Sequence, residues 1–337
     1  MWQTRTLPSV LLVLGLLVCV ACGAHTRVTH RVPVAVPHRV RESSAAASFA
    51  QPIDLRAFTR GACVAFSPLA RARHETVFLD AGHGGRDPGA VGATEAGRTI
   101  VEAAETLPVE LYTMAFLRSA GFRVVVSRTQ DSSVLRLGRD DVSGALLTVE
   151  GSHEDVLARA ACANDAHANV LVGIYFNAGA PASAGCLTTY DAVRPFAAEN
   201  LRLAKLVQAG VLAAMNARGW SIPSEGVVSD AGLGSTINST ADAYGHLSLL
   251  GPAYPGWVAS PSRMPGALIE PLFLTDPFEG SIAASREGQE VIAHGLANAV
   301  ERYFASGYAR PTRDPHRASR PQGTYVRARD NGWGRNG

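Results

Sequence analysis

The stretch from Thr76 to Gly92 reads TVFLDAGHGGRDPGAVG, and it decides which fold the chain can adopt. Its first five residues form a short apolar strand that runs directly into a glycine-rich turn. The glycines beside His83 let the backbone turn sharply and leave the imidazole exposed at the carboxyl end of the strand. An imidazole in that place is a suitable metal ligand. The alternative is that His83 only orders the turn.

Strands and helices alternate along the chain beyond this stretch. Apolar spacing predicts helices over residues 102–120, 155–168, 194–218 and 288–304, and strands over residues 76–80, 122–127, 170–175, 187–190 and 266–270. Strands separated by helices of this length indicate an α/β fold, a single domain whose mainly parallel twisted sheet carries helices on both faces. Sites in such folds lie beyond the carboxyl ends of the strands, where His83 is expected.

The two ends of the 337-residue chain differ in composition from its centre. Residues 1–22 contain an almost wholly apolar run that predicts an export signal, too short for a membrane span. Residues 23–70 are rich in Pro, Arg and His without a sustained period, so we expect a flexible linker. Residues 71–307 carry the predicted domain. Residues 308–337 are basic and poor in apolar side chains, which predicts a disordered tail.

The end of the signal, Leu17 to Cys22, reads LVCVAC and resembles a bacterial lipoprotein box with Cys22 as the lipidated residue. A plain cleaved signal with an incidental cysteine is the alternative. Either interpretation predicts a protein of the cell envelope that works outside the cytoplasm, secreted or attached to the membrane through its lipidated N-terminus.

An oxidising compartment permits one disulfide among Cys63, Cys162 and Cys186, and the sequence does not choose the pair. The cysteines lack the spacing of metal ligands. The formal net charge is +2, so no global field favours nucleic acid as a partner.

The run around His83 resembles the opening motif of the family 3 N-acetylmuramoyl-L-alanine amidases, zinc enzymes that separate the stem peptide from the glycan of peptidoglycan. The resemblance extends over residues 76–304 and includes several later motifs in the family's order. These are Glu102 at a helix start, Ser127-Arg128 at a strand end, Ala158-Arg159-Ala160 with Asn164 in a helix, and MPGALIEPLFLTDP over residues 264–277, which contains Glu270.

The resemblance implies a zinc amidase-like fold with His83 and Glu102 as zinc ligands and Glu270 as the catalytic acid and base. Zinc with an open position polarises a carbonyl and lowers the pKa of a bound water, and a free Glu transfers the proton to the leaving amine. Other interpretations exist for each carboxylate. Glu102 could be a charge that favours the helix start, with Glu95 and Glu105 less well placed as ligands, and Glu270 could be a solvated strand end.

The chain departs from the family at the third ligand, a His in the family, where Tyr175 stands in the run Gly173 to Asn177. Three interpretations remain open. Tyr175 binds zinc as a phenolate, although zinc sites favour His, Cys and carboxylates. Another histidine replaces it, with His246 in the long segment before Glu270 as the first candidate and His153 and His167 as others. In the third interpretation, zinc binding is weakened or lost.

The predicted function is zinc-dependent hydrolysis of peptidoglycan at the amide between N-acetylmuramic acid and L-alanine. A noncatalytic envelope protein that binds peptidoglycan or a partner is the alternative, motivated by Tyr175. A different metallohydrolase on the same fold is a third interpretation, because the fold alone does not determine the substrate.

Overall fold

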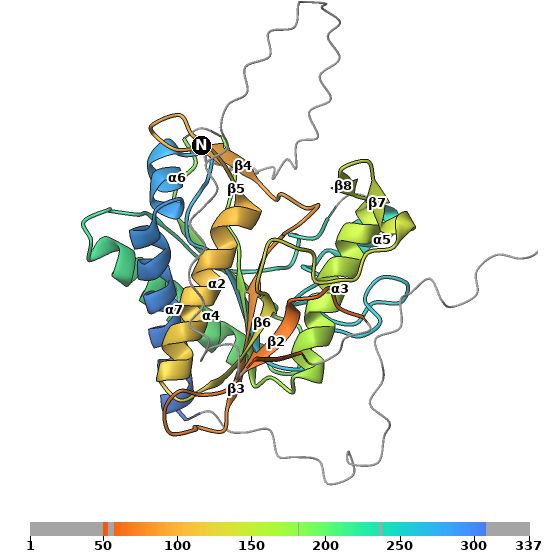
Figure 1. Ribbon diagram of the computed structural model, residues 1–337, viewed down its shortest axis with the longest axis horizontal. Coiled ribbons are helices and arrows are strands. Elements are labelled where there is room, and N and C mark those ends of the chain that lie inside the picture. Colours follow the sequence, from red (N-terminus) through yellow and green to blue (C-terminus); the bar gives the residue numbers. More distant parts are fainter. Residues whose placement is uncertain (1–49, 53–56, 181, 236–237, 308–337) are drawn as a thin grey trace, which may run out of the picture. The chain divides into compact units, whose positions relative to one another are not determined.

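A computed structural model describes residues 50–52, 57–180, 182–235 and 238–307, all of which belong to one compact unit. The predicted signal, the lipidation site at Cys22 and the basic tail lie outside the described residues. The described unit is an α/β fold with a central sheet and helices on both faces, as the alternating pattern predicts (Figure 1).

Eight strands form the central sheet. Their order across the sheet is β1 (Ala50–Pro52), β2 (Ala62–Phe66), β6 (Arg123–Arg128), β3 (Thr76–Ala81), β9 (Val170–Ile174), β12 (Gly266–Glu270), β10 (Cys186–Tyr190) and β11 (Ser224–Ser229). The strands β6, β3, β9 and β12 run parallel, whereas β2 and β10 are antiparallel to their neighbours β6 and β12. The sheet is therefore mixed and mostly parallel.

The central strands are buried on both faces, which explains why they read as continuous apolar runs. Val77 and Leu79 of β3 point into the core beneath α2 (Glu102–Ser119), α4 (Ala197–Asn216) and α7 (Arg286–Ala305). Phe78 points into the second core, beneath α3 (Val149–Asp165). Figure 1 shows α2 and α7 on one side of the sheet and α3 on the other. None of the described helices is both long and apolar enough to cross a membrane.

Shorter elements fill the connections. They are β4 (Val91–Ala93), β5 (Thr99–Val101), the 3-10 helix η1 (Arg139–Asp141), β7 (Val142–Ser143), β8 (Leu146–Leu147), α5 (Ser239–Tyr244) and α6 (Pro277–Ala283).

The linker predicted over residues 23–70 ends earlier than expected. The strands β1 and β2 both fall within that range, and every residue of β2 is buried in the sheet. This correction has a simple cause: β2 pairs with β6, so a run of five residues without periodicity of its own is ordered by its neighbour.

The disulfide joins Cys63 of β2 to Cys162 of α3 and so ties that strand to the helix covering it. Cys186 is free and buried. Of the pairs that the sequence left open, the fold forms the one whose Cα atoms lie 5.7 Å apart.

Because the strands run in two directions, they end at two opposite edges of the sheet. The strands β3, β9 and β12 end at one edge, which we call the His83 edge. Leu187 pairs with Glu270 and Thr189 pairs with Leu268, so β10 runs the other way and ends beside the start of β12. Because β11 is parallel to β10, both strands end at the opposite edge.

Candidate active site

His83 lies two residues beyond the end of β3, in a backbone conformation that is rare for a residue with a side chain. Its φ is 59°, in the left-handed region. The Arg159 guanidinium donates from Nη2 to the His83 carbonyl oxygen at 2.8 Å, and Arg128 donates to the carbonyl oxygen of Gly82 at 3.2 Å. Two buried arginines therefore hold the turn in a shape that costs energy, a feature common at functional sites.

The two nitrogens of the His83 ring each meet a carboxylate. The Nε2 atom lies 3.1 Å from Glu102 Oε2, and the Nδ1 atom lies 2.9 Å from Asp87 Oδ2. Burial alone would lower the pKa of His83, but Glu102 and Asp87 outweigh it and raise the pKa to about 10. The two carboxylates therefore favour a positive charge on the His83 ring.

Glu102 is the first residue of α2 and is almost fully buried, with 4% of its side chain exposed. Its Oε1 atom accepts from the Phe176 amide and its Oε2 atom accepts from the Ala90 amide, each at 2.9 Å. These bonds fix the carboxylate against His83. Of the competing acids, Glu95 is exposed and Glu105 is buried against Gln289, at 2.9 Å.

Gly89 lets the second turn approach the site closely. A Cβ atom at Gly89 would lie 2.6 Å from Glu102 Oε2 and 2.6 Å from the His83 ring, distances at which atoms overlap. The φ of Gly89 is +66°, which also disfavours a side chain. The turn that begins at Asp87 therefore closes over His83 and Glu102.

Glu270 ends β12, at the same edge of the sheet as His83. Burial and the negative charge of Glu102 together raise the pKa of Glu270 to about 7, with His83 opposing the shift. The carboxyl of Glu270 thus lies within electrostatic reach of both other groups. A carboxyl group with this pKa can both accept and donate a proton near neutral pH.

Tyr175 follows β9, and its side chain is directed toward the face covered by α3. The ring packs on Gly82, where a Cβ atom would lie 2.4 Å from the ring. The hydroxyl donates to Asp80 Oδ2 at 3.1 Å. Burial and the negative charge of Asp80 hold the pKa of Tyr175 well above its ordinary value. The phenol is therefore neutral, and its oxygen faces Asp80 while its ring meets the His83 ring edge-on at 5.4 Å.

The sequence did not indicate the network behind Tyr175. Arg159 donates to Asp80 Oδ1 and to Asp155 Oδ2, each at 2.8 Å, and its side chain is only 1% exposed. Because the same guanidinium holds the His83 carbonyl, this network links Tyr175 to the turn. The signal available in the sequence was Asp80 itself, a charged residue at the end of an apolar strand.

The other candidate histidines do not join His83. His246 Nδ1 lies 3.1 Å from Asp230 Oδ1 and 3.3 Å from Asp191 Oδ2, at the opposite edge of the sheet. His153 stacks on Trp257 with ring centroids 3.6 Å apart. His167 follows α3 in a left-handed turn, before β9 begins.

The donor chemistry of His83 and Glu102 fits zinc. Two ligands of a tetrahedral zinc ion lie roughly 3.3 Å apart when each bond is about 2.0 Å, and the Nε2 and Oε2 atoms are 3.1 Å apart. The Asp87 carboxylate on Nδ1 is the usual outer partner of a zinc-binding imidazole. Tyr175 does not add a third ligand in this arrangement, because its hydroxyl bonds to Asp80.

Comparisons with known proteins show the family to which the chain belongs. The model of the N-acetylmuramoyl-L-alanine amidase family matches residues 77–302, which include His83, Glu102 and Glu270. The germination-specific N-acetylmuramoyl-L-alanine amidase of Bacillus subtilis (strain 168) is 25% identical over 230 residues, 68% of this chain and 79% of that protein. The Bacillus subtilis (strain 168) protein YqiI is 26% identical over 249 residues, 72% of this chain and 94% of YqiI.

Among solved structures, the CwlD amidase from Clostridioides difficile, determined in complex with the GerS lipoprotein, has the same fold. The TM-score is 0.51 at 21% identity, and the match covers 69% of this chain and 100% of that one.

Proposed function

Because the chain belongs to the N-acetylmuramoyl-L-alanine amidase family, we propose that it hydrolyses peptidoglycan at the amide between N-acetylmuramic acid and L-alanine. The observation that carries the proposal is the meeting of His83 Nε2 with Glu102 Oε2 beside Glu270. The carboxylates of Glu102 and Glu270, both largely buried near the His83 imidazole, repel each other unless a positive charge lies between them. Such a cluster is expected where a cation binds, and the family is zinc-dependent.

The residues of the chain divide the reaction between them. His83 and Glu102 would hold zinc, which supplies a Lewis acid for the scissile carbonyl and for the attacking water. Asp87 accepts from Nδ1 and so presents the lone pair of Nε2 to the ion. Glu270, with its pKa raised to about 7 by burial, takes the proton of the attacking water and returns it to the leaving nitrogen.

The substrate also determines where the protein would act. Peptidoglycan lies outside the cytoplasm, and the Cys63–Cys162 disulfide suits an oxidising compartment. We therefore propose an extracytoplasmic enzyme, attached to the membrane if Cys22 is lipidated.

The test is digestion of purified peptidoglycan by the full chain over a zinc titration. We expect stem peptides with a free N-terminal L-alanine to be released as zinc is added. The variant His83→Ala should release none at any zinc concentration tested. Absence of release by the unsubstituted chain at saturating zinc would exclude the hydrolase, and equal release by His83→Ala would exclude His83 from the site.

A second function, noncatalytic binding of peptidoglycan, is favoured by the hydrogen bond between Tyr175 and Asp80. That bond occupies the hydroxyl at the position of the third ligand, so the site would bind zinc weakly. This function predicts that the full chain sediments with insoluble peptidoglycan and releases no peptide at any zinc concentration. Release of peptides in the zinc titration would contradict it.

A further inference from the structure

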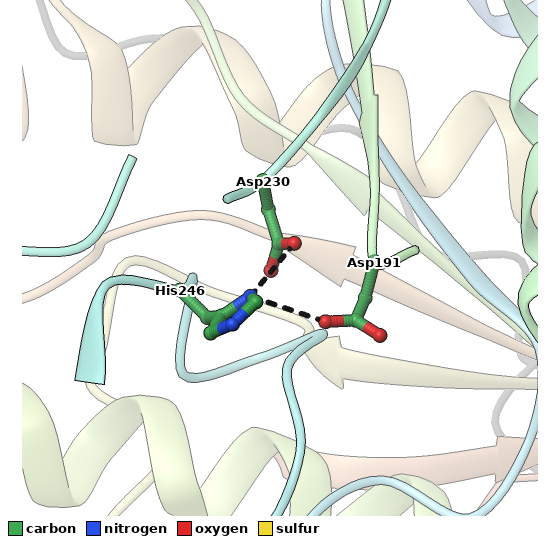
Figure 2. A group of neighbouring side chains, drawn as sticks. All are labelled: Asp191, Asp230 and His246. Carbon is green, nitrogen blue, oxygen red and sulfur yellow. Dashed lines mark hydrogen bonds and ion pairs between the residues drawn. The ribbon is translucent and has the colours of Figure 1, made fainter. Parts of the chain in front are cut away.

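A second cluster of metal-ligand side chains lies at the edge of the sheet opposite His83. Asp191 follows the end of β10 and Asp230 follows the end of β11, and these two strands are parallel neighbours. The Asp230 amide donates to the Tyr190 carbonyl oxygen at 2.9 Å, which keeps the two strand ends together. His246 reaches them from the segment after α5 (Figure 2). We call these three residues the Asp191 cluster.

The side chains of the Asp191 cluster converge on one point. The Nδ1 atom of His246 lies 3.1 Å from Asp230 Oδ1 and 3.3 Å from Asp191 Oδ2, and all three ligand atoms lie within 4.8 Å of one another. The two spacings from His246 Nδ1 match the separation between ligands of a tetrahedral zinc ion, roughly 3.3 Å. Figure 2 shows both carboxylates pointing toward the same edge of the imidazole.

One oxygen in the cluster has no hydrogen-bond partner among the described residues. Asp191 is fully buried, and its Oδ2 atom accepts no hydrogen bond, although it points at His246. An ionised carboxylate oxygen buried without a donor is costly. A cation between Asp191 Oδ2 and His246 Nδ1 would remove that cost.

Bonds from the backbone hold the carboxylates in place independently of the imidazole. Asp191 Oδ1 accepts from the Val193 amide at 3.0 Å and from the Arg194 amide at 2.8 Å. Asp230 Oδ2 accepts from the Leu247 amide at 3.2 Å. One oxygen of each carboxylate is thus used for support, and the other faces the centre of the cluster.

The segment that carries His246 is anchored as well. Gly245 ends α5 in a left-handed conformation, and its carbonyl oxygen accepts from the Gly232 amide at 2.8 Å. The nearby Arg194 guanidinium donates to the carbonyl oxygens of Leu250, Gly251 and Ser262. The guanidinium therefore satisfies the backbone of the same region, and its charge also interacts with Asp191 and Asp230.

We propose that Asp191, Asp230 and His246 form a second metal site that binds a zinc-like divalent cation. The site would join the ends of β10 and β11 to the segment after α5. One imidazole and two carboxylates are ligands that zinc accepts, and three protein ligands leave one position for water. The His246 side chain is 17% exposed, so an ion can enter from solvent.

The competing explanation is a protonated imidazole that bridges two aspartates without metal. In that case, the cluster needs no cation, and zinc should neither bind there nor stabilise the protein. Zinc binding and its effect on thermal unfolding therefore distinguish the two explanations, because a metal that binds only the native state raises the unfolding temperature.

The experiment uses the full chain carrying His83→Ala, so that zinc at the candidate active site does not contribute. We expect the dialysed protein to bind about one zinc ion per chain and to unfold at a higher temperature with zinc than with a chelator. Adding Asp230→Asn or, separately, His246→Asn should abolish both effects. The matched control His294→Ala removes an exposed histidine outside the cluster and should change neither.

Circular dichroism checks that each variant is folded, and two variants of different chemistry guard against a local defect in either one. Failure of the folded His83→Ala protein to bind zinc would overturn the proposal. Zinc binding that is unchanged when Asp230→Asn or His246→Asn is added to His83→Ala would also overturn it. Neither outcome affects the proposed hydrolase, because its test reads peptide release and the loss caused by His83→Ala.

Discussion

Position 175 lies just beyond the carboxyl end of β9, on the strand face that points toward α3. Gly82 pairs with this region, since its amide donates to the Ile174 carbonyl oxygen at 2.9 Å. An imidazole at position 175 would therefore start beside the His83 turn. The tyrosine that stands there is longer, and its hydroxyl reaches Asp80. Whether the proposed zinc site has two or three protein ligands thus depends on one side chain.

Tyr175→His is expected to raise zinc affinity at the candidate active site at least about tenfold, because it adds a third protein ligand. Isothermal titration with zinc measures it, and peptide release at limiting zinc should rise in parallel. The control Tyr175→Phe removes only the hydroxyl. It should leave zinc affinity unchanged and lower the free energy of unfolding by about 1–3 kcal/mol, since Asp80 loses a buried donor. Unchanged zinc affinity in Tyr175→His would show that position 175 is not where the missing ligand belongs.

The placement of a residue could be predicted where it follows from the end of its own strand or the start of its own helix. His83, Glu102 and Glu270 each stand at a strand end or a helix start, so their placement at one edge follows from the order of the elements. The partners of Tyr175 and His246 could not be predicted in the same way. Asp80 meets Arg159 only because α3 packs on that face. Asp191 meets Asp230 only because β10 and β11 are parallel neighbours that end side by side.

At the scale of elements, the turn from Asp87 to Ala90 joins the His83 turn to the start of α2. The Ala90 amide donates to Glu102, and the Glu102 amide donates to the Ala90 carbonyl oxygen at 2.8 Å. Helix and turn therefore position each other, and the site depends on how closely the backbone at Gly89 can approach.

Gly89→Ala is expected to abolish zinc binding at His83 and peptide release, because its Cβ atom would overlap Glu102 and the His83 ring. The matched control is Gly97→Ala. Gly97 also has a positive φ, +75°, but no heavy atom lies within 4 Å of its Cβ position. Both variants should lose about 1–2 kcal/mol of unfolding free energy from backbone strain, and only Gly89→Ala should lose zinc, measured by titration. Equal activity of the two variants would contradict the close approach at Gly89.

The disulfide between Cys63 and Cys162 links β2 covalently to α3. Replacing both Cys63 and Cys162 with Ala should lower the free energy of unfolding by about 2–5 kcal/mol, since the bond joins residues 99 apart in sequence. Denaturant unfolding measures the loss. The control Cys186→Ala keeps the disulfide and tests a buried thiol alone. A stability unchanged by the double substitution would show that the bond does not form.

Three strands of the central sheet, β1, β2 and β11, were not predicted, and the reasons for the last two belong to this scale. The strand β2 is a run of five residues that is ordered by pairing with β6. The strand β11 lies at the edge of the sheet and is half exposed, so its polar sequence SEGVVS carries no apolar run to identify it. The helices α2, α4 and α7 lie close to their predicted bounds, whereas α3 begins at Val149, six residues before the predicted start at residue 155.

At the scale of the whole molecule, a buried carboxyl group joins α2 to two strands of the sheet. Glu110 of α2 accepts from the Ala81 and Ser127 amides, at 3.0 and 2.9 Å, and so bridges β3 and β6. Its Oε2 atom has no hydrogen-bond partner among the described residues. Burial raises the pKa of Glu110 to about 7, with Arg128 opposing the shift.

The raised pKa of Glu110 predicts how stability depends on pH. The native state holds the proton more tightly than the unfolded chain, where the pKa is near 4.5. The stabilisation is therefore complete below pH 4.5 and is lost as the pH rises through about 7, a loss on the order of 3 kcal/mol. Denaturant unfolding at a series of pH values measures it. The variant Glu110→Gln should flatten this part of the profile, and a profile unchanged by the substitution would refute the assignment.

The chain as a whole is a scaffold whose parallel strands bring His83, Glu102 and Glu270 to one edge, in a family of peptidoglycan amidases. The most direct measurement of the central claim is the rate of peptide release from peptidoglycan at saturating zinc, for the full chain and for Glu270→Gln. We expect Glu270→Gln to bind peptidoglycan and zinc as the unsubstituted chain does but to release stem peptides at least about a hundredfold more slowly. Equal rates for the two proteins would contradict it.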